Sequence, residues 1–131
     1  MFQFFNKYNF IFYLINLIVI VFYLFPGSLI GCFLYSNCQL EPQIEPNFLI
    51  STNHMLIFFI LSLIGFFTFR KINEYRLLMI YLIFLCFFLE VMHNFIPERS
   101  FEYKDLLGNF IGIVIGAIAI IFFKKYENNK N

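Results

Sequence analysis

A dense group of polar side chains that could perform chemistry in this 131-residue chain falls in one stretch, LEVMHNFIPERSFEYKDLLGN, residues 89–109. Glu90 and His93 lie one helical turn apart and would share one face of a helix. In di-iron helix bundles this Glu-x-x-His spacing supplies metal ligands, but such sites need two copies of the motif and two further glutamates. This chain has one copy, which His54 and Asp105 would extend to a zinc site by ligand type. Because a helix-end histidine with a hydrogen-bond partner is more common, we predict neither a metal nor a cofactor.

The other polar residues of this stretch suit anion binding or helix termini. The Arg99 guanidinium can hold a phosphate or carboxylate through two parallel hydrogen bonds, although arginine is also a common anchor at a membrane interface. Asp105 suits a helix N-cap, where its charge complements the helix dipole. Asn109 follows one turn later on the same face. Nucleophilic catalysis has little support, because Ser100 has no base and orienting group near it in the sequence.

The elements that must position these residues are membrane helices, because the composition is far more apolar than that of a soluble domain. Hydrophobic residues make up 61% of the chain and charged residues 13%, and the mean hydropathy is +0.79. Soluble domains are typically about 45–50% apolar and about 25% charged, and one small domain cannot bury so much apolar surface. The formal charge of +1 provides no field for nucleic acid, and we see no basic stripe or phosphate-binding glycine loop. We therefore exclude a nucleic-acid partner.

Four apolar segments reach or approach the roughly 20 residues that a membrane-spanning helix requires. Since backbone groups in lipid must be paired internally and these apolar runs are continuous, we predict helices rather than β-strands. The fold class is predicted to be all-α, a single-domain bundle of four transmembrane helices, the first interrupted at Pro26-Gly27. The predicted spans cover residues 8–33, 48–69, 77–95 and 106–123.

The positive charges of the loops predict how this bundle is oriented. Lys7, Lys130 and five further basic residues lie on the side that holds both termini, whereas Arg99 and Lys104 lie on the other side. Both termini are therefore predicted to be cytoplasmic, and the polar residues of three spans meet at the outer surface. The predicted outward-facing pocket contains His54, Glu90, His93, Arg99, Asp105 and Asn109.

Glu90 is the polar residue that is most costly to place in lipid. It precedes Pro97, which should end the third span, by seven residues, so it lies about 10 Å inside that end at 1.5 Å per residue. A carboxylate at this depth is a functional hypothesis by default, and an ion pair that fixes helix packing is the structural alternative. Gly108, Gly112 and Gly116 form a small-xxx-small series that would let the fourth span pack closely against a neighbour.

The cysteines leave two interpretations open. Cys32 and Cys38 fall on the predicted outer side, where an oxidising compartment permits a disulfide bond. Alternatively, LIGC, residues 29–32, is a lipoprotein processing box, and the segment before it is a signal peptide. That segment is longer than the usual apolar region of about 7–15 residues. Cys86 falls within the third span and is predicted to be buried and inert.

The second half of the chain, LEVMHNFIPERSFEYKDLLGNFIGIVIG, resembles the signature of the VanZ-like family of small bacterial membrane proteins. In that pattern a helical glutamate precedes Pro-x-Arg-Ser, then Asp, then Asn and spaced glycines. The residues on the pattern are Glu90, Pro97, Arg99, Ser100, Asp105, Asn109, Gly112 and Gly116.

Elsewhere the resemblance is partial. His54 with Phe58 resembles the start of the family's second span, and Pro26-Gly27-Ser28 resembles the end of its first. Ile50 and Ser51 stand where the family commonly has an Asp-Lys pair, which weakens any mechanism that needs this pair. The family's Gln is His93 here, so this position becomes titratable.

The resemblance implies a multi-pass protein of the bacterial cytoplasmic membrane with a role in the cell envelope, as in glycopeptide resistance. The family's biochemical activity is unassigned. We expect the pocket to bind or shield an anionic lipid headgroup, a lipid-linked cell-wall precursor or a glycopeptide-like ligand, with Arg99 holding the anionic group. A membrane hydrolase or transferase is the second interpretation, with Glu90 or a histidine as general base. A structural assembly partner without a ligand is the third. Membrane lipids are expected partners, and the sequence leaves catalysis and oligomeric state open.

Overall fold

The computed structural model describes residues 7–129, with side chains from residue 9 onward, and this range is all-helical with no strand. The all-α class is thereby confirmed. The Lys7 side chain and Lys130, which contribute to the predicted orientation, lie outside the described parts. The helices are α1 (Lys7–Leu24), α2 (Leu29–Tyr35), α3 (Thr52–Thr68), α4 (Ile72–Met92), the 3-10 helix η1 (His93–Phe95) and α5 (Tyr103–Asn128).

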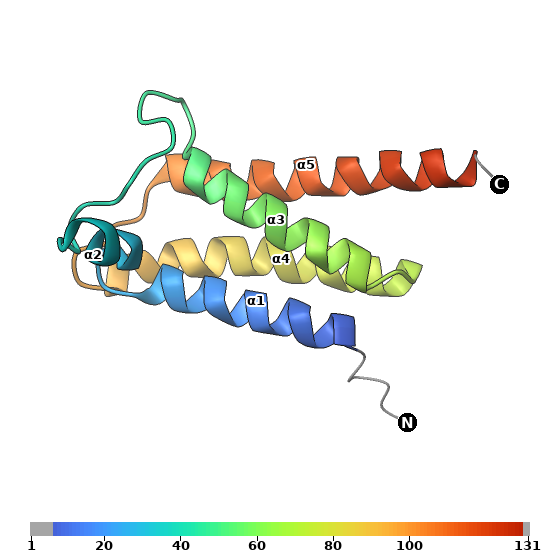
Figure 1. The fold of residues 1–131 in the computed structure, drawn as a ribbon, viewed down its shortest axis with the longest axis horizontal. Helices are drawn as coiled ribbons and strands as arrows, with labels where there is room; N and C mark the ends of the chain where they lie inside the picture. Colours follow the sequence, from blue (N-terminus) through green and yellow to red (C-terminus); the bar gives the residue numbers. More distant parts are fainter. Residues whose placement is uncertain (1–6, 130–131) are drawn as a thin grey trace.

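The four longer helices α1, α3, α4 and α5 form a bundle along the long axis of the molecule, and α2 lies across one end (Figure 1). The start of α1, the α3–α4 turn and the end of α5 lie at the opposite end. The segments at the α2 end are α2 itself, residues 36–51 and residues 93–102. We call this end the site end, because the predicted pocket residues lie at or near it.

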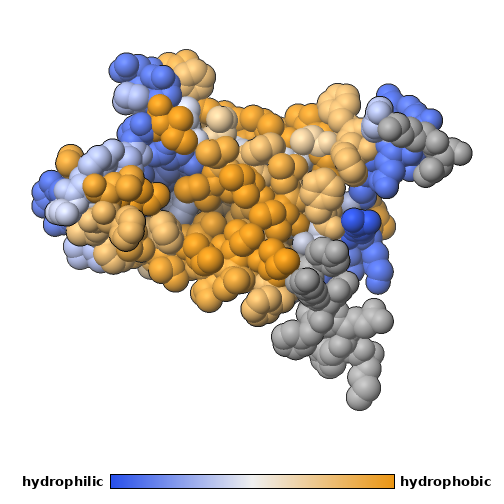
Figure 2. Space-filling view, in the orientation of Figure 1, coloured by the Kyte–Doolittle hydropathy of each residue, from blue (hydrophilic) through white to orange (hydrophobic). Residues whose placement is uncertain are grey.

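The exterior of the bundle is apolar along its middle and polar at both ends (Figure 2). Leu77, Ile80 and Phe84 of α4, for example, are each more than 60% exposed. A contiguous apolar surface of this extent is a normal exterior in lipid, whereas soluble monomers rarely carry one in water. The sequence and the structure thus agree on a membrane protein.

Two to three parts of the described chain are long and apolar enough to cross a membrane. Residues 72–95 (α4 with η1) and helix α5 qualify individually, and the bent pair of α1 and α2 is a third candidate. Helix α3 is apolar but has 17 residues, which makes it shorter than a typical span. The number of four spans and the cytoplasmic location of both termini therefore remain predictions.

The first predicted span is divided into α1 and α2, which are bent by 78° relative to each other. Helix α1 ends two residues before Pro26, as expected because proline disfavours helical conformation in the preceding residue. Gly27 has a φ of +77°, and a Cβ at this position would collide with the carbonyl oxygen of Cys38. The hydroxyl of Ser28 then caps α2 by accepting a hydrogen bond from the Gly31 N–H at 3.0 Å. The Pro-Gly-Ser sequence thus turns the chain across the site end.

The observed starts of α3 and α5 differ from the predicted limits of their spans. Helix α3 begins at Thr52 rather than at residue 48, because polar side chains of its first turn bind the preceding loop. Asn53 Nδ2 donates to the Pro42 carbonyl at 2.6 Å, and Asn53 Oδ1 accepts from the Ile44 N–H at 3.0 Å. Helix α5 begins at Tyr103, three residues before its predicted start.

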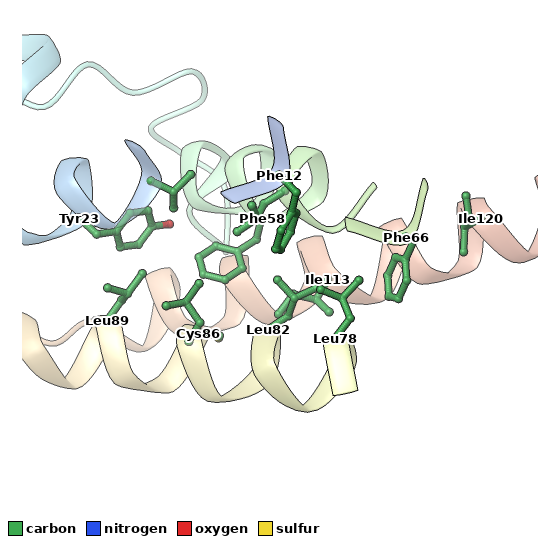
Figure 3. Close-up of a cluster of buried hydrophobic side chains, with 13 residues drawn as sticks. Phe12, Tyr23, Phe58, Phe66, Leu78, Leu82, Cys86, Leu89, Ile113 and Ile120 are labelled. Carbon is green, nitrogen blue, oxygen red and sulfur yellow. The ribbon is translucent and has the colours of Figure 1, made fainter. Parts of the chain in front are cut away.

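A row of buried apolar side chains from α1, α3, α4 and α5 forms the core (Figure 3). Phe58, Leu82 and Ile113 have no exposed surface. The row runs from Ile120 to Tyr23, the last labelled residue of α1 in the view, which lies beside the polar cluster described below. The apolar core therefore ends where the candidate site begins.

Helices α3 and α5 pack with their backbones in close contact. Gly108, Gly112 and Gly116 all lie on the α5 face that meets α3, and a Cβ at any of the three would collide with α3 or with the residue before it. At Gly112 the collision is with the backbone of Met55 and Phe59. Small residues at this spacing are what a close helix pair in lipid requires.

Gly112→Ala is predicted to destabilise the bundle by about 1–3 kcal/mol, the usual cost of overpacking. The added methyl group would meet backbone atoms, which cannot rotate away as a side chain can. Alanine is otherwise favoured over glycine inside a helix by about 0.5–1 kcal/mol, so helix propensity cannot explain a loss. Thermal unfolding of the purified protein in detergent measures the change.

Gly65→Ala is the matched control for this variant. Its new methyl group would meet side-chain atoms of Leu78 and Phe12, which can shift, so a smaller loss is expected. If Gly112→Ala unfolds at the wild-type temperature, this result would contradict the close backbone contact between α3 and α5.

Candidate functional site

Polar side chains from several helices are buried together at the site end. His54, Glu90, His93 and Asn109 are each at most 3% exposed, although all four carry hydrogen-bonding groups. They come from α3, α4, η1 and α5, respectively. Burial of polar groups is costly unless they are paired, so the partners of these four side chains determine what the cluster can do.

Glu90 and His93, the predicted Glu-x-x-His pair, face each other. His93 Nε2 lies 3.1 Å from the backbone carbonyl of Tyr23. Because a carbonyl only accepts, Nε2 carries a proton. His93 Nδ1 lies 3.4 Å from Glu90 Oε1. An imidazole and a carboxylate are therefore placed side by side within the buried cluster.

The two oxygens of the Glu90 carboxylate have different surroundings. Oε1 also accepts a hydrogen bond from the Glu102 N–H at 2.9 Å, which ties the end of α4 to the start of α5. Oε2 is buried and has no hydrogen-bond partner in the described part of the chain. One oxygen of this carboxylate is thus bound within the protein, and the other oxygen is available to a ligand.

His54 lies between two carboxylates. Its Nε2 is 3.6 Å from Asp105 Oδ2 and 3.8 Å from Glu41 Oε1. The imidazole lowers the pKa of Glu41, and the partial burial of this carboxyl group acts in the opposite direction. His54 Nδ1 is buried without a hydrogen-bond partner among the residues described. Glu41 comes from the loop before α3 and was not predicted as a site residue; the only signal was its position on the same side as the pocket.

Tyr23 joins the two histidines and Asn109, and it was also missed from the sequence. Its hydroxyl donates to Asn109 Oδ1 at 2.7 Å. Its ring centroid lies 4.9 Å from that of His54 and 5.8 Å from that of His93. A tyrosine within a long apolar run gives no sequence signal of this position, because the partners come from three other helices.

Arg99 contacts the end of helix α1. Its Nε donates to the Phe25 carbonyl at 3.1 Å, and its Nη2 donates to the carbonyls of Gly27 at 2.5 Å and Phe22 at 3.3 Å. The last carbonyls of a helix lack intrahelical partners, so this guanidinium acts as a C-terminal cap. The predicted contact of Arg99 with an anionic ligand remains a prediction.

Asp105 is the third residue of α5, and Glu102 rather than Asp105 occupies the N-cap position. The helix starts earlier than predicted, which moves Asp105 into the first turn. Its charge still complements the positive end of the helix dipole there. Its side chain is 18% exposed, so it connects the buried cluster with the surface.

A polar cavity of about 100 Å³ opens beside this cluster. Its lining includes the carboxylates of Glu41, Glu98, Glu102 and Asp105, together with Arg99 and His93. The acidic groups outnumber the guanidinium, whose Nε and Nη2 already face backbone carbonyls. The cavity is therefore an acidic one, which favours cations and hydrogen-bond donors.

A larger cavity of about 710 Å³ lies between α1 and α4 near the opposite end of the bundle. Phe12, Leu78 and other apolar residues contribute most of its surface, and Glu74 is the one carboxylate among its lining residues. It holds no group of titratable side chains comparable with the site end. The smaller cavity is therefore the candidate functional site.

Cys32 and Cys38 form a disulfide bond, and Cys86 is a buried free thiol. The bond fixes α2 to the loop that leads to Glu41. A disulfide bond persists in an oxidising compartment rather than in the cytosol. This feature favours the predicted outward orientation of the site end.

Comparison with protein-family models, curated proteins and solved structures finds no match to this chain. The resemblance to the VanZ-like family rests on the motif in residues 89–116.

Arg99→Ala is predicted to lower stability by about 1–3 kcal/mol, because it leaves partly buried carbonyls at the end of α1 without a donor. Arg99→Lys should recover little of this lost stability, since one ammonium group cannot reach several carbonyls as the planar guanidinium does. Thermal unfolding of both variants checks this. Lys104→Ala, at an exposed lysine in the first turn of α5, is the control and should change stability by less than about 0.5 kcal/mol. Wild-type stability of Arg99→Ala would show that the guanidinium does not cap α1.

Alkylation of the unfolded, non-reduced protein is predicted to modify one cysteine, Cys86, whereas three are modified after reduction. The intact mass of the alkylated protein measures both numbers. Loss of the first 31 residues together with a mass increase from acyl chains would instead support lipoprotein processing at Cys32.

Proposed function

We propose that this chain is a VanZ-like protein of the bacterial cytoplasmic membrane whose site end faces outward. Its pocket binds or shields a polar group of an envelope lipid or a lipid-linked cell-wall precursor. The disulfide bond between Cys32 and Cys38 supports this orientation, and so does the excess of Lys and Arg on the opposite side.

The observation that carries this proposal is the set of unpaired polar atoms at the site end. Glu90 Oε2, His54 Nδ1 and Asn109 Nδ2 are all buried without hydrogen-bond partners within the described chain. Each such atom costs about 1–3 kcal/mol. A cluster that only fixed helix packing would be expected to pair these atoms, as it pairs Tyr23 with Asn109 Oδ1. They lie behind the polar cavity, whose lining includes His93 and Asp105, the neighbours of Glu90 and His54. This placement suits a polar group bound at the cavity.

The charge of the cavity narrows the kind of ligand. A bare phosphate or carboxylate would face Glu41, Glu98, Glu102 and Asp105, and like charges at this range repel. An anionic group therefore enters together with a cation. The cation is carried by the ligand, as in a zwitterionic headgroup, or is held by the carboxylates beforehand.

The size and place of the cavity indicate a small polar group on a larger membrane molecule. Pockets for whole small molecules measure about 300–1,000 Å³, whereas this cavity measures about 100 Å³. It lies at the polar end of an apolar exterior, which is the depth of lipid headgroups (Figure 2). A headgroup or the phosphate of a lipid-linked precursor can reach it while the acyl chains stay in the bilayer.

Two imidazole–carboxylate pairs support an enzyme as the second candidate. His93 and Glu90 lie 3.4 Å apart, and His54 and Asp105 lie 3.6 Å apart. A carboxylate beside an imidazole is the usual arrangement of a general base and the group that orients it. A hydrolase or transferase acting on a lipid-linked substrate would use one of these pairs to deprotonate water or a hydroxyl group.

Mass spectrometry of lipids that copurify with the protein in mild detergent tests the proposed function. The wild type should be enriched several-fold in one class of envelope lipid or lipid-linked precursor relative to the bulk membrane. Asp105→Asn should lose this enrichment, because it changes the charge where the cluster meets the cavity. Glu74→Gln, which changes one carboxylate near the opposite end, should keep it.

A lipid profile of the wild type identical to the bulk membrane would contradict ligand binding. Conversion of an added lipid-linked precursor to product by the wild type, and not by Asp105→Asn, would establish the enzyme instead.

A further inference from the structure

We infer that His54, Glu90 and Asp105 form a binding site for one divalent transition-metal ion, and that Zn²⁺ fits their ligand set. The evidence for the site is independent of any lipid. The role of the ion rests on the proposed function: it would supply the positive charge that an anionic ligand needs in this acidic cavity.

The three side chains converge from three different helices. His54 lies in the first turn of α3, Glu90 in the last turn of α4 and Asp105 in the first turn of α5. One ligand atom from each, an imidazole nitrogen or a carboxylate oxygen, lies within 4.8 Å of the other two. Tetrahedral ligand atoms at about 2.0–2.2 Å from a zinc ion are separated by about 3.3–3.6 Å. A contraction of up to about 1.5 Å between ligand atoms, within reach of side-chain rotation, would therefore bring all three into coordination.

The unpaired Glu90 oxygen is a separate observation that indicates a cation. Glu90 has no exposed surface, and its Oε1 is already used by the Glu102 N–H and His93. Its Oε2 has no hydrogen-bond partner in residues 7–129. A buried, unpaired carboxylate oxygen is costly, and a metal ion is one of the partners that remove this cost. The unpaired oxygen thus belongs to Glu90, which is itself one of the three converging ligands.

The ligand chemistry selects the class of metal. One neutral imidazole and two carboxylates carry a charge of −2, which balances a divalent cation. Imidazole suits zinc and the neighbouring transition metals, whereas magnesium and calcium prefer sites made of oxygen alone. His54 Nε2 faces Asp105, so the imidazole and one carboxylate already point toward a common space.

His93 does not act as a ligand in this site but positions one. Its Nε2 is bound to the Tyr23 carbonyl, and its Nδ1 faces Glu90 Oε1. Both ring nitrogens are therefore engaged elsewhere, and the Nδ1 contact orients the Glu90 carboxylate. Supporting contacts of this kind fix ligand geometry in known metal sites.

The fourth position of the site opens toward the cavity. Glu41 Oε1 lies 3.8 Å from His54 Nε2, and the Glu41 side chain is 41% exposed. This loop carboxylate can bind the ion or can move away to admit a phosphate oxygen. Three protein ligands with one exchangeable position are typical of zinc sites that bind substrates. The ion would thereby convert an acidic cavity into one that accepts an anionic headgroup.

Zinc titration of the full-length, tag-free protein in detergent tests this inference. The protein is first stripped with a chelator, and bound Zn²⁺ is measured by calorimetry and by elemental analysis. We expect one Zn²⁺ per chain, an increase in unfolding temperature on binding, and no competition from Mg²⁺. Substitution with Co²⁺ should give visible absorption bands that report nitrogen and oxygen ligands.

Asp105→Asn and Glu90→Gln should each weaken Zn²⁺ binding by at least about tenfold, as loss of a supporting or direct ligand does elsewhere. Glu98→Gln is the matched control, because Glu98 is an exposed carboxylate of the same cavity that lies outside the cluster. Should Glu90→Gln fail to fold, Asp105→Asn still decides the result, because Asp105 is partly exposed.

A wild type that binds no Zn²⁺ overturns the inference, as does equal binding by wild type, Asp105→Asn and Glu90→Gln. Since these titrations contain no lipid, their failure leaves the proposed lipid binding standing. Conversely, intact Zn²⁺ binding without copurifying lipid would overturn the proposed function alone.

Discussion

The burial of one carboxylate, that of Glu90, is the constraint to which the surrounding structure responds. Its Oε1 accepts the Glu102 N–H and faces His93, which fixes how the chain leaves α4 and enters α5. Helix α5 therefore starts early enough to place Asp105 in its first turn. The glycine face of α5 then packs against α3 and brings His54 to the same group. A polar residue that is costly in lipid thus organises the end of an otherwise apolar bundle.

The turn after α1 depends on the same end of the molecule. Pro26 and Gly27 end the first helix and leave its last carbonyls without helical partners, and Arg99 binds them from the loop between α4 and α5. The backbone carbonyl of Tyr23 binds His93, and the Tyr23 hydroxyl donates a hydrogen bond to Asn109. The apolar core holds the helices together along the middle (Figure 3), whereas polar contacts define their arrangement at the site end. At the site end, the residues that hold the helices in place are therefore also the residues of the candidate site.

The sequence predicted the features that depend on local pattern and missed those that depend on folding at a distance. Long apolar runs predicted the helices, and Pro-Gly predicted the interruption of the first span. Polar residues on one side of the membrane predicted that His54, Glu90 and Asp105 would be neighbours. Glu41 and Tyr23 escaped prediction, because nothing near either in the chain shows that it contacts a histidine. The contacts of Arg99 were equally unpredictable, since the free carbonyls exist only once the 78° bend has formed. No metal was predicted from ligand types alone, because a hydrogen-bonded histidine at a helix end is more common; the inference of a metal site depends on the convergence of His54, Glu90 and Asp105 in the structure.

The central claim is that the buried polar cluster is maintained for a ligand rather than for helix packing. The unfolding temperature of metal-free Glu90→Gln tests it most directly. Glutamine keeps an oxygen for the Glu102 N–H and removes the negative charge of the carboxylate, whose Oε2 is unpaired. The account predicts that this variant unfolds at or above the wild-type temperature. A decrease of about 4 °C or more, equivalent to about 1 kcal/mol for a domain of this size, would show that the charge itself holds the helices together and would contradict the claim.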